Sequence, residues 1–371
     1  MRTFLRLMAG TVLTLSLAGA VAFGQHYSQT NLVSSVSGMA PVTDPDLINP
    51  WGLSRSSGSP WWVSDNGTGL STLYTGAGVK EGLVVTIPPV VAGNMGTPTG
   101  TIYSGSATGF LLIGATPARF LFSTLDGTIV GWNSTAGAVA SVKTTDGSSY
   151  TGLTSAFIGA NQYLYAANFT KGRVDVYDSS FKRVKFNEEH FDDDWLPWGY
   201  SPFNVQAIGN NIVVTYAWHE PGQTHETDGP GLGYVDIYSS DGALLQRLEH
   251  GKWLNAPWGV ALAPNDFGRY SHDLLIGQFA GGGTTVSSGY IAAYDLVSGR
   301  LDGLLKDSAG NPIAINGIWA ISPGNGGTGN SNAAGAPAAE VYFTAGPSGG
   351  TEGLFGYLTA VSTELIQGND Q

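Results

Sequence analysis

Cysteine is absent from the chain, and charged residues make up only 12% of it. The lack of cysteine excludes disulfides, a thiol nucleophile and cysteine-based metal or haem sites. Basic residues are also scarce, with 16 Lys and Arg against 28 Asp and Glu, so the formal net charge is −12. A chain this acidic is repelled by nucleic acid and by anionic lipid, and we expect neither as a partner.

Long apolar runs are also lacking, apart from one at the N-terminus. Residues 7–23 are apolar and follow Arg2 and Arg6, and Ala22 and Gly24 suit a cut before Gln25. This pattern predicts a signal peptide over residues 1–24, with a membrane anchor as the alternative. Its removal changes the net charge to −14, because it carries two Arg and no acid. We therefore expect a secreted or periplasmic protein with no membrane span after cleavage.

Glycine is abundant, with 54 residues, and hydrophobic residues make up 42% of the chain. This composition provides a core and favours strands joined by tight turns. One phrase recurs at six places: a small or polar residue, often Pro, then Gly or Asn, then an alternating apolar segment. The six copies begin at Asn49, Thr97, Tyr150, Ser201, Asn255 and Ile315.

Two further alternating segments with aromatic residues follow each copy, as half-buried antiparallel strands do. Six such units at a spacing of roughly 50 residues predict an all-β fold, a six-bladed β-propeller, as a single domain over residues 25–371. The last blade lacks a strand, and the segment Tyr27–Gly38 is spare. We expect this N-terminal strand to close the ring, with residues 363–367 as the alternative.

Several phrases carry a resemblance, among them "TDPDLINPWGL", "FLFSTLDGTIVGW", "LNAPWGVALAPNDFG" and "GYIAAYD". They resemble those of uncharacterised bacterial exported proteins related to NHL-type six-bladed propellers. The match runs from about Gln29 to Leu358. Some members end in a PEP-CTERM sorting tail, which this chain lacks, and the family carries no established activity to transfer.

The start of each innermost strand defines the top face of a propeller, where ligands usually bind. The residues expected there are rich in amides and aromatic rings, which suit sugars and other neutral polar ligands. The alternative is that Asn serves turns and Trp packs between blades. The predicted residues of the channel mouth are Asn49, Trp51, Asp65, Asn66, Asn168, Asn204, Asn255, Trp258, Asn316 and Trp319.

Acidic residues near the same face are candidate metal ligands. Related propeller lactonases and lyases bind Ca²⁺ in the channel, so the resemblance makes Ca²⁺ the candidate cofactor. The candidate ligands are Asp65, Asp126 and Glu220, with Asp192 and Asp194 as a second set. Turn residues and a solvated acidic run are the alternatives.

The function expected from these features is binding of a polar small molecule, a glycan or a protein partner through the top face. The first alternative is a Ca²⁺-assisted hydrolase or lyase at the channel mouth, and the second is a structural surface protein. The phrase "PWG" occurs at Pro50–Gly52 and again at Pro257–Gly259. We expect its Gly to let the innermost strands approach one another.

Overall fold

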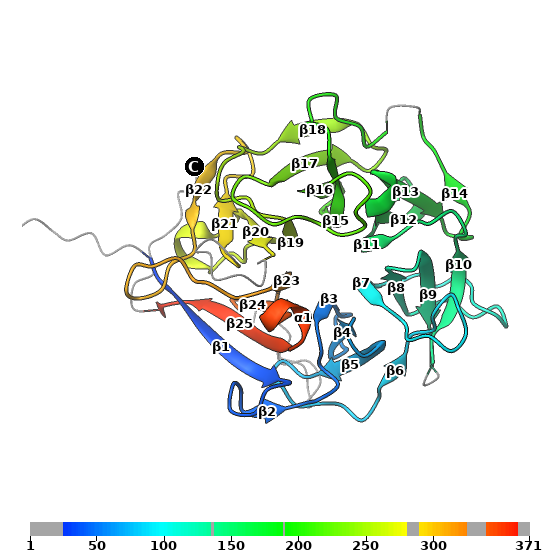
Figure 1. Cartoon of the computed structure of the whole chain (residues 1–371), viewed down its shortest axis with the longest axis horizontal. Helices are drawn as coiled ribbons and strands as arrows, with labels where there is room; N and C mark the ends of the chain where they lie inside the picture. The colour runs from blue at the N-terminus through cyan, green and yellow to red at the C-terminus, as the bar shows by residue number, and fades with distance from the viewer. Residues whose placement is uncertain (1–24, 135–136, 188–189, 280–288, 325–338, 363–371) are drawn as a thin grey trace, which may run out of the picture.

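Six β-sheets surround a central axis like the blades of a propeller (Figure 1). This computed structural model describes residues 25–134, 137–187, 190–279, 289–324 and 339–362. In each sheet neighbouring strands run antiparallel from the axis outwards, as the alternating segments predict, except for one short parallel pair at the outer edge of one sheet. The six-bladed propeller expected from the sequence is confirmed.

Blades one to three each contain four strands in chain order. Blade one contains β3 (Pro50–Ser54), β4 (Trp61–Asp65), β5 (Leu70–Tyr74) and β6 (Val85–Thr86). Blade two contains β7 (Pro98–Tyr103), β8 (Phe120–Thr124), β9 (Thr128–Trp132) and β10 (Val139–Lys143). Blade three contains β11 (Tyr150–Ile158), β12 (Asn161–Asn168), β13 (Arg173–Asp178) and β14 (Arg183–Val184).

Blades four and five repeat this order, and blade six joins both ends of the chain. Blade four contains β15 (Tyr200–Ile208), β16 (Asn211–Trp218), β17 (Gly233–Ser239) and β18 (Leu244–Arg247). Blade five contains β19 (Pro257–Leu262), β20 (Leu274–Gln278), β21 (Ile291–Tyr294) and β22 (Leu301–Leu304). Blade six contains β23 (Ile318–Pro323), β24 (Val341–Ala345), β25 (Leu354–Ala360), β1 (Tyr27–Ser34) and β2 (Val42–Thr43).

The N-terminal strand closes the ring. Strand β1 pairs antiparallel with β25, from Tyr27 opposite Ala360 to Ser34 opposite Leu354. Figure 1 shows the first and last described strands side by side in blade six. The closure predicted from the sequence is confirmed, and the alternative strand at 363–367 lies outside the described residues. Pairing the two ends removes a sheet edge that would otherwise be exposed.

Glycines on the innermost strands allow neighbouring blades to come close. A Cβ on Gly52 of β3 would lie 2.4 Å from the carbonyl oxygen of Thr99 in β7. A Cβ on Gly259 of β19 would lie 2.6 Å from the carbonyl oxygen of Trp319 in β23. Both distances are too short for a real side chain, so the Gly of each "PWG" phrase has the packing role expected for it.

Helical structure is minor in the described residues. It consists of one four-residue helix, α1 (Pro347–Gly350), and two 3₁₀ turns, η1 (Phe169–Lys171) and η2 (Gly268–Tyr270). None of these is long enough to cross a membrane. The core is therefore formed by side chains between adjacent sheets, divided into several buried clusters.

Candidate functional site

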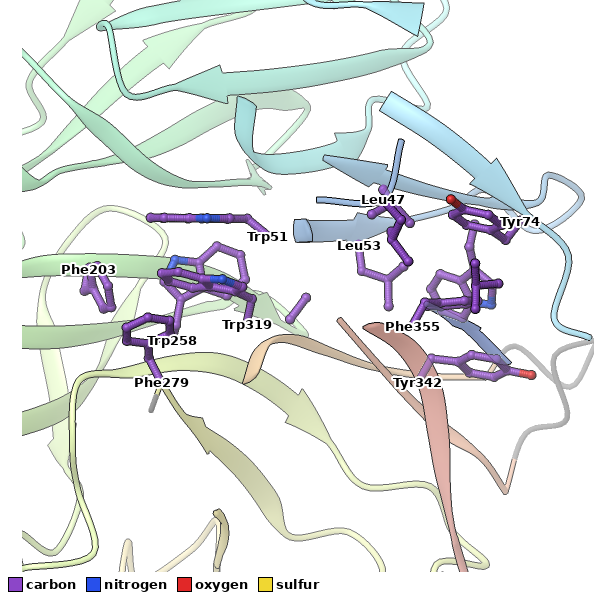
Figure 2. Close-up of a cluster of buried hydrophobic side chains, with 14 of the residues drawn as sticks. Leu47, Trp51, Leu53, Tyr74, Phe203, Trp258, Phe279, Trp319, Tyr342 and Phe355 are labelled. Carbon is purple, nitrogen blue, oxygen red and sulfur yellow. The ribbon is translucent and has the colours of Figure 1, made fainter. Parts of the chain in front are cut away.

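The top end of the central channel is filled by aromatic rings. Trp51 and Trp319 stack with their ring centroids 3.6 Å apart, and Trp258 lies edge-on to both, at 6.2 and 5.9 Å (Figure 2). Phe203 and Phe279 complete the group. These five residues, which we call the channel cluster, come from blades one, four, five and six. All five are buried, with exposed fractions of 9% or less.

Hydrogen bonds across the channel hold two indoles of the channel cluster. The Nε1–H of Trp258 in blade five donates to the carbonyl oxygen of Thr151 in blade three, at 3.0 Å. The Nε1–H of Trp319 in blade six donates to Oδ1 of Asn49 in blade one, at 2.9 Å. Because both indoles bond to protein groups, neither offers this donor to a ligand.

The amides predicted at the mouth form hydrogen bonds to neighbouring segments of the chain. The side-chain amide of Asn204 donates to the carbonyl oxygen of Trp258, and that of Asn66 donates to Pro98. Asn168 donates to the carboxylate of Asp175, and Oδ1 of Asn255 accepts from the backbone of Gly229. Each amide therefore has a partner that explains it without a ligand.

The other two predicted mouth residues, Asn316 and Asp65, differ in exposure. Asn316 is exposed just before β23. Asp65 is fully buried, one carboxylate oxygen accepts from the backbone N–H of Thr72 at 2.9 Å, and burial raises its pKa well above the usual range. The sequence predicted an open ring of these side chains, whereas packing across the axis fills that end of the channel.

The candidate metal ligands lie in separate surroundings. The carboxylate of Asp126 accepts from the Thr124 hydroxyl and from the backbone N–H of Val90, as a turn residue does. Glu220, Asp192 and Asp194 are exposed. Within the described parts of the chain, no three Asp, Glu or His side chains are grouped so that they could hold a metal ion. Binding of Ca²⁺ therefore stays a prediction, and the described residues provide no grouped set of ligands for it.

A cavity of about 510 Å³ opens at the other end of the channel, which we call the bottom face. It is lined by the later residues of the innermost strands, after the positions that hold the channel cluster. Trp258 and Asn204 are the only predicted mouth residues among the lining. The cavity therefore lies at the opposite end of the channel from the face where the sequence analysis placed the candidate site.

The cavity lining mixes apolar and polar surface in similar amounts, with one charged side chain among the described residues. Its apolar part includes Leu53, Ile102, Leu153, Val260 and Ile321. Its polar side chains are Ser54, Arg55, Ser56, Ser57, Thr101, Asn204, Gln206 and Ser322. A cavity of this size and mixture is typical of a site for a small organic molecule.

Several aromatic side chains lie on blade four and on the loops that lead into and out of it, and two of them are strongly exposed. Trp195 and Trp198, in the loop between β14 and β15, have exposed fractions of 81% and 78%. Tyr200 and Tyr234 meet edge-on nearby along the chain, and the ring of His250 stacks on Tyr234 at 4.3 Å. We call these five residues the blade-four aromatic surface. The sequence analysis missed both tryptophans because they lie in a loop, outside the strand pattern.

Defined contacts hold the loop that carries the two tryptophans. The carboxylate of Asp193 accepts from the backbone N–H of Trp195 at 2.8 Å and from the guanidinium of Arg247 on β18. The same guanidinium lies 5.9 Å from the centre of the Trp195 ring. Gly199, at φ +93°, passes so close to Trp218 that a Cβ there would lie 2.6 Å from its Nε1. The loop is therefore fixed to blade four.

Two acids in the adjacent loop between β16 and β17 have raised pKa values. Burial raises the pKa of Glu226 to about 7 and that of Asp228 to about 6. The nearby imidazole of His225 opposes both shifts. In the same loop His219 lies within hydrogen-bond distance of the Ser201 hydroxyl, at 3.0 Å. Glu226 and Asp228 therefore titrate near neutral pH, in a loop that leads into Tyr234 of the blade-four aromatic surface.

Sequence comparison finds relatives that are themselves uncharacterized. One uncharacterized protein of Acanthamoeba polyphaga mimivirus is 30% identical over 338 residues, covering 88% of this chain and 84% of its own length. Another from the same virus is 30% identical over 301 residues, covering 79% and 72%. No family model matches the chain. Both relatives are viral, so they give no support to the bacterial origin implied by the resemblance.

Solved structures with a similar arrangement include enzymes. A streptogramin B lyase is 11% identical with a TM-score of 0.46, covering 92% of this chain and 99% of the lyase chain. The PQQ-bound aldose sugar dehydrogenase of Streptomyces coelicolor is 13% identical with a TM-score of 0.48, covering 90% and 98%. Similarity at this level carries no information about activity.

Proposed function

We propose that this chain is an exported protein that binds neutral glycans at the blade-four aromatic surface. The chain belongs to the family of the uncharacterized mimivirus proteins described above, and that family has no assigned activity. The observation that carries this proposal is the exposure of Trp195 and Trp198, at 81% and 78%. Large aromatic side chains are costly to leave in water, and soluble proteins expose them together mainly at binding sites.

The tryptophans are positioned before any ligand arrives. Asp193 and Arg247 hold the loop, so little conformational entropy is lost when Trp195 meets a ligand. Tyr200 is similarly placed, since its hydroxyl donates to the carbonyl oxygen of Gly231. A prearranged set of aromatic faces with nearby polar groups supports binding of sugar rings, which present apolar faces and hydroxyl edges.

Charge around this surface favours a neutral ligand over an anionic one. Asp192, Asp194 and Glu220 are exposed in the same and the adjacent loop, and the whole chain carries a net charge of −12. Carboxylates accept hydrogen bonds from sugar hydroxyls, but they repel phosphates and acidic polysaccharides. A neutral glycan therefore fits the surface better than nucleic acid, anionic lipid or an acidic glycan.

Binding to insoluble neutral polysaccharides tests this proposal. Cellulose, chitin and starch granules are incubated with the protein, and the bound fraction is measured by sedimentation. For the polysaccharide that binds best, Trp198→Ala and Trp195→Ala should each lower the affinity roughly tenfold or more, as loss of an aromatic anchor does. Trp198→Phe should retain part of the affinity, because it keeps an aromatic face.

The matched control is Ile113→Ala, since Ile113 is 87% exposed in the loop between β7 and β8. That variant should bind like the original protein. Binding to none of the three polysaccharides, or binding that both tryptophan variants leave unchanged, would refute the glycan proposal.

A further inference from the structure

The cavity at the bottom face has a feature that glycan binding does not explain. Arg55, just after β3, is the only charged side chain among the described residues that line it. The lining contains no acid, although the chain has 28 Asp and Glu against 16 Lys and Arg. A single cation inside a cavity attracts anions, because the surrounding protein atoms limit screening by water.

Contacts on both sides fix the position of the Arg55 guanidinium. Its Nη2 donates to the carbonyl oxygen of Pro323 in β23, at 2.8 Å. The guanidinium carbon lies 4.5 Å from the centre of the Trp61 ring, a cation–π contact. Burial lowers the pKa of Arg55 to about 10, so the group remains charged at neutral pH. Both contacts are to uncharged groups, and no carboxylate of the described residues forms an ion pair with Arg55.

Unsatisfied hydrogen-bonding groups lie in the same lining. Nε of Arg55 is buried and has no hydrogen-bond partner among the described residues. The hydroxyl of Thr101, in β7, is likewise buried and has no hydrogen-bond partner among the described residues. Buried polar groups without partners are uncommon in folded proteins, so these two atoms mark a part of the cavity wall whose polarity the described residues leave unbalanced.

We propose that the bottom-face cavity binds a small organic anion, whose carboxylate or phosphate group pairs with Arg55 and whose apolar body packs against the cavity wall. A guanidinium bonds well to either oxyanion, because its planar N–H groups match two oxygens at once. The wall formed by Leu53, Leu153 and Val260 offers apolar surface for the rest of the molecule. This site is separate from the blade-four aromatic surface, so either proposal can fail alone.

Three probes with the same phenyl ring test the proposal. Phenylacetate carries a carboxylate, phenyl phosphate carries a phosphate, and phenylacetamide is the neutral isostere of the first. Affinities are measured by NMR titration, with the indole N–H of Trp258 as reporter because this side chain lines the cavity. We expect the better anion to bind roughly tenfold or more tightly than phenylacetamide, as a charge-assisted hydrogen bond implies. The stronger of the two anions identifies the preferred oxyanion group.

Substitutions locate the binding site. Arg55→Gln should lower the affinity for the anion by the same factor and leave that for phenylacetamide unchanged. The matched control is Arg300→Gln, which removes the same charge from an exposed position outside the lining and should change nothing. Ser322→Trp, which places a large ring in the cavity, should abolish the binding of all three probes.

Several outcomes would overturn the proposal. These are equal affinity for phenylacetate, phenyl phosphate and phenylacetamide, no binding of any probe, or an anion preference that survives Arg55→Gln. If Arg55→Gln fails to fold, because Arg55 packs on Trp61, the anion preference of the original protein and its loss in Ser322→Trp still decide the matter. Glycan binding plays no part in these measurements.

Discussion

The two ends of the central channel are built by the same six strands, yet one end is filled and the other is open. At the top, blades one, five and six each contribute a tryptophan, with rings stacked as closely as 3.6 Å. At the bottom, later residues of the same strands line a cavity of about 510 Å³. The tryptophan rings at the top are larger than the aliphatic side chains at the open level, such as Leu53 and Val260.

The filled end of the channel is built for stability, whereas the open end has the features of a binding site. The filled end joins four blades through ring contacts and hydrogen bonds that cross the axis. The open end has a fixed charge, Arg55, and a cavity that a small molecule could enter. We expect substitutions at the top to affect folding, and substitutions at the bottom to affect binding.

The largest effect should follow from emptying the filled end. Trp319 is 2% exposed and contacts all four other members of the channel cluster. Trp319→Ala should lower the free energy of unfolding by about 3–5 kcal/mol, because it removes a large buried ring and leaves a void. Urea denaturation followed by circular dichroism measures this change.

The matched substitution at the open end is Ser322→Ala, which should change the stability by less than about 0.5 kcal/mol. Equal losses for Trp319→Ala and Ser322→Ala would show that the two ends do not differ as described. A loss below about 1 kcal/mol for Trp319→Ala would show that the cluster contributes little to folding.

The next effect concerns the close approach of the innermost strands. Gly52→Ala places a methyl group 2.4 Å from the Thr99 carbonyl oxygen, which is backbone and has little room to move. We expect a loss of about 1–3 kcal/mol, the usual cost of overpacking. Gly58→Ala is the control, because a Cβ at Gly58 meets no atom within 4 Å. Thermal unfolding of both variants measures the difference, and a neutral Gly52→Ala would contradict the close packing.

Much of the fold could be predicted from the sequence because the inner three strands of each blade are buried. Their apolar and aromatic content gives a strong strand signal, as in β8 (Phe120–Thr124), where all five residues are buried. The outermost strands were not predicted. Strands β6 and β14 have two residues each, and β14 is partly exposed, so neither carries a periodic signal. Pairing with the rest of the sheet defines these short strands.

The channel was harder to predict than the strands. Sequence analysis placed Trp51, Trp258 and Trp319 together near the axis, but as a rim around an opening. Whether an indole at that level reaches across the axis depends on the spacing between blades, and that spacing is set by all six blades together. Trp195 and Trp198 left a local signal, since two tryptophans stand in a Pro-containing acidic loop with no strand pattern. That signal indicates exposure, and it was not used.

The smallest effect concerns the response of the two ends to pH. Glu226 and Asp228, in the loop between β16 and β17 on the top face, have pKa values of about 7 and about 6. An acid whose pKa is higher in the folded protein than in the unfolded chain holds its proton more tightly in the folded state. The free energy of unfolding therefore falls as the pH rises from the pKa of the unfolded chain to that of the folded protein. At the bottom, Arg55 has a pKa of about 10 and does not titrate in this window.

We therefore expect the melting temperature to fall as the pH rises from about 4.5 to 8. Asp236 and Asp273 should add to this fall, because burial raises their pKa values to about 8 and about 7. Glu226→Gln should remove on the order of 1 kcal/mol of this dependence, because the partly solvated site screens the charge. Glu220→Gln, an exposed position in the same loop, should leave the slope unchanged. Melting temperatures across this pH range decide between them, and parallel curves for the two variants would place the titrating groups elsewhere than in the top-face loop.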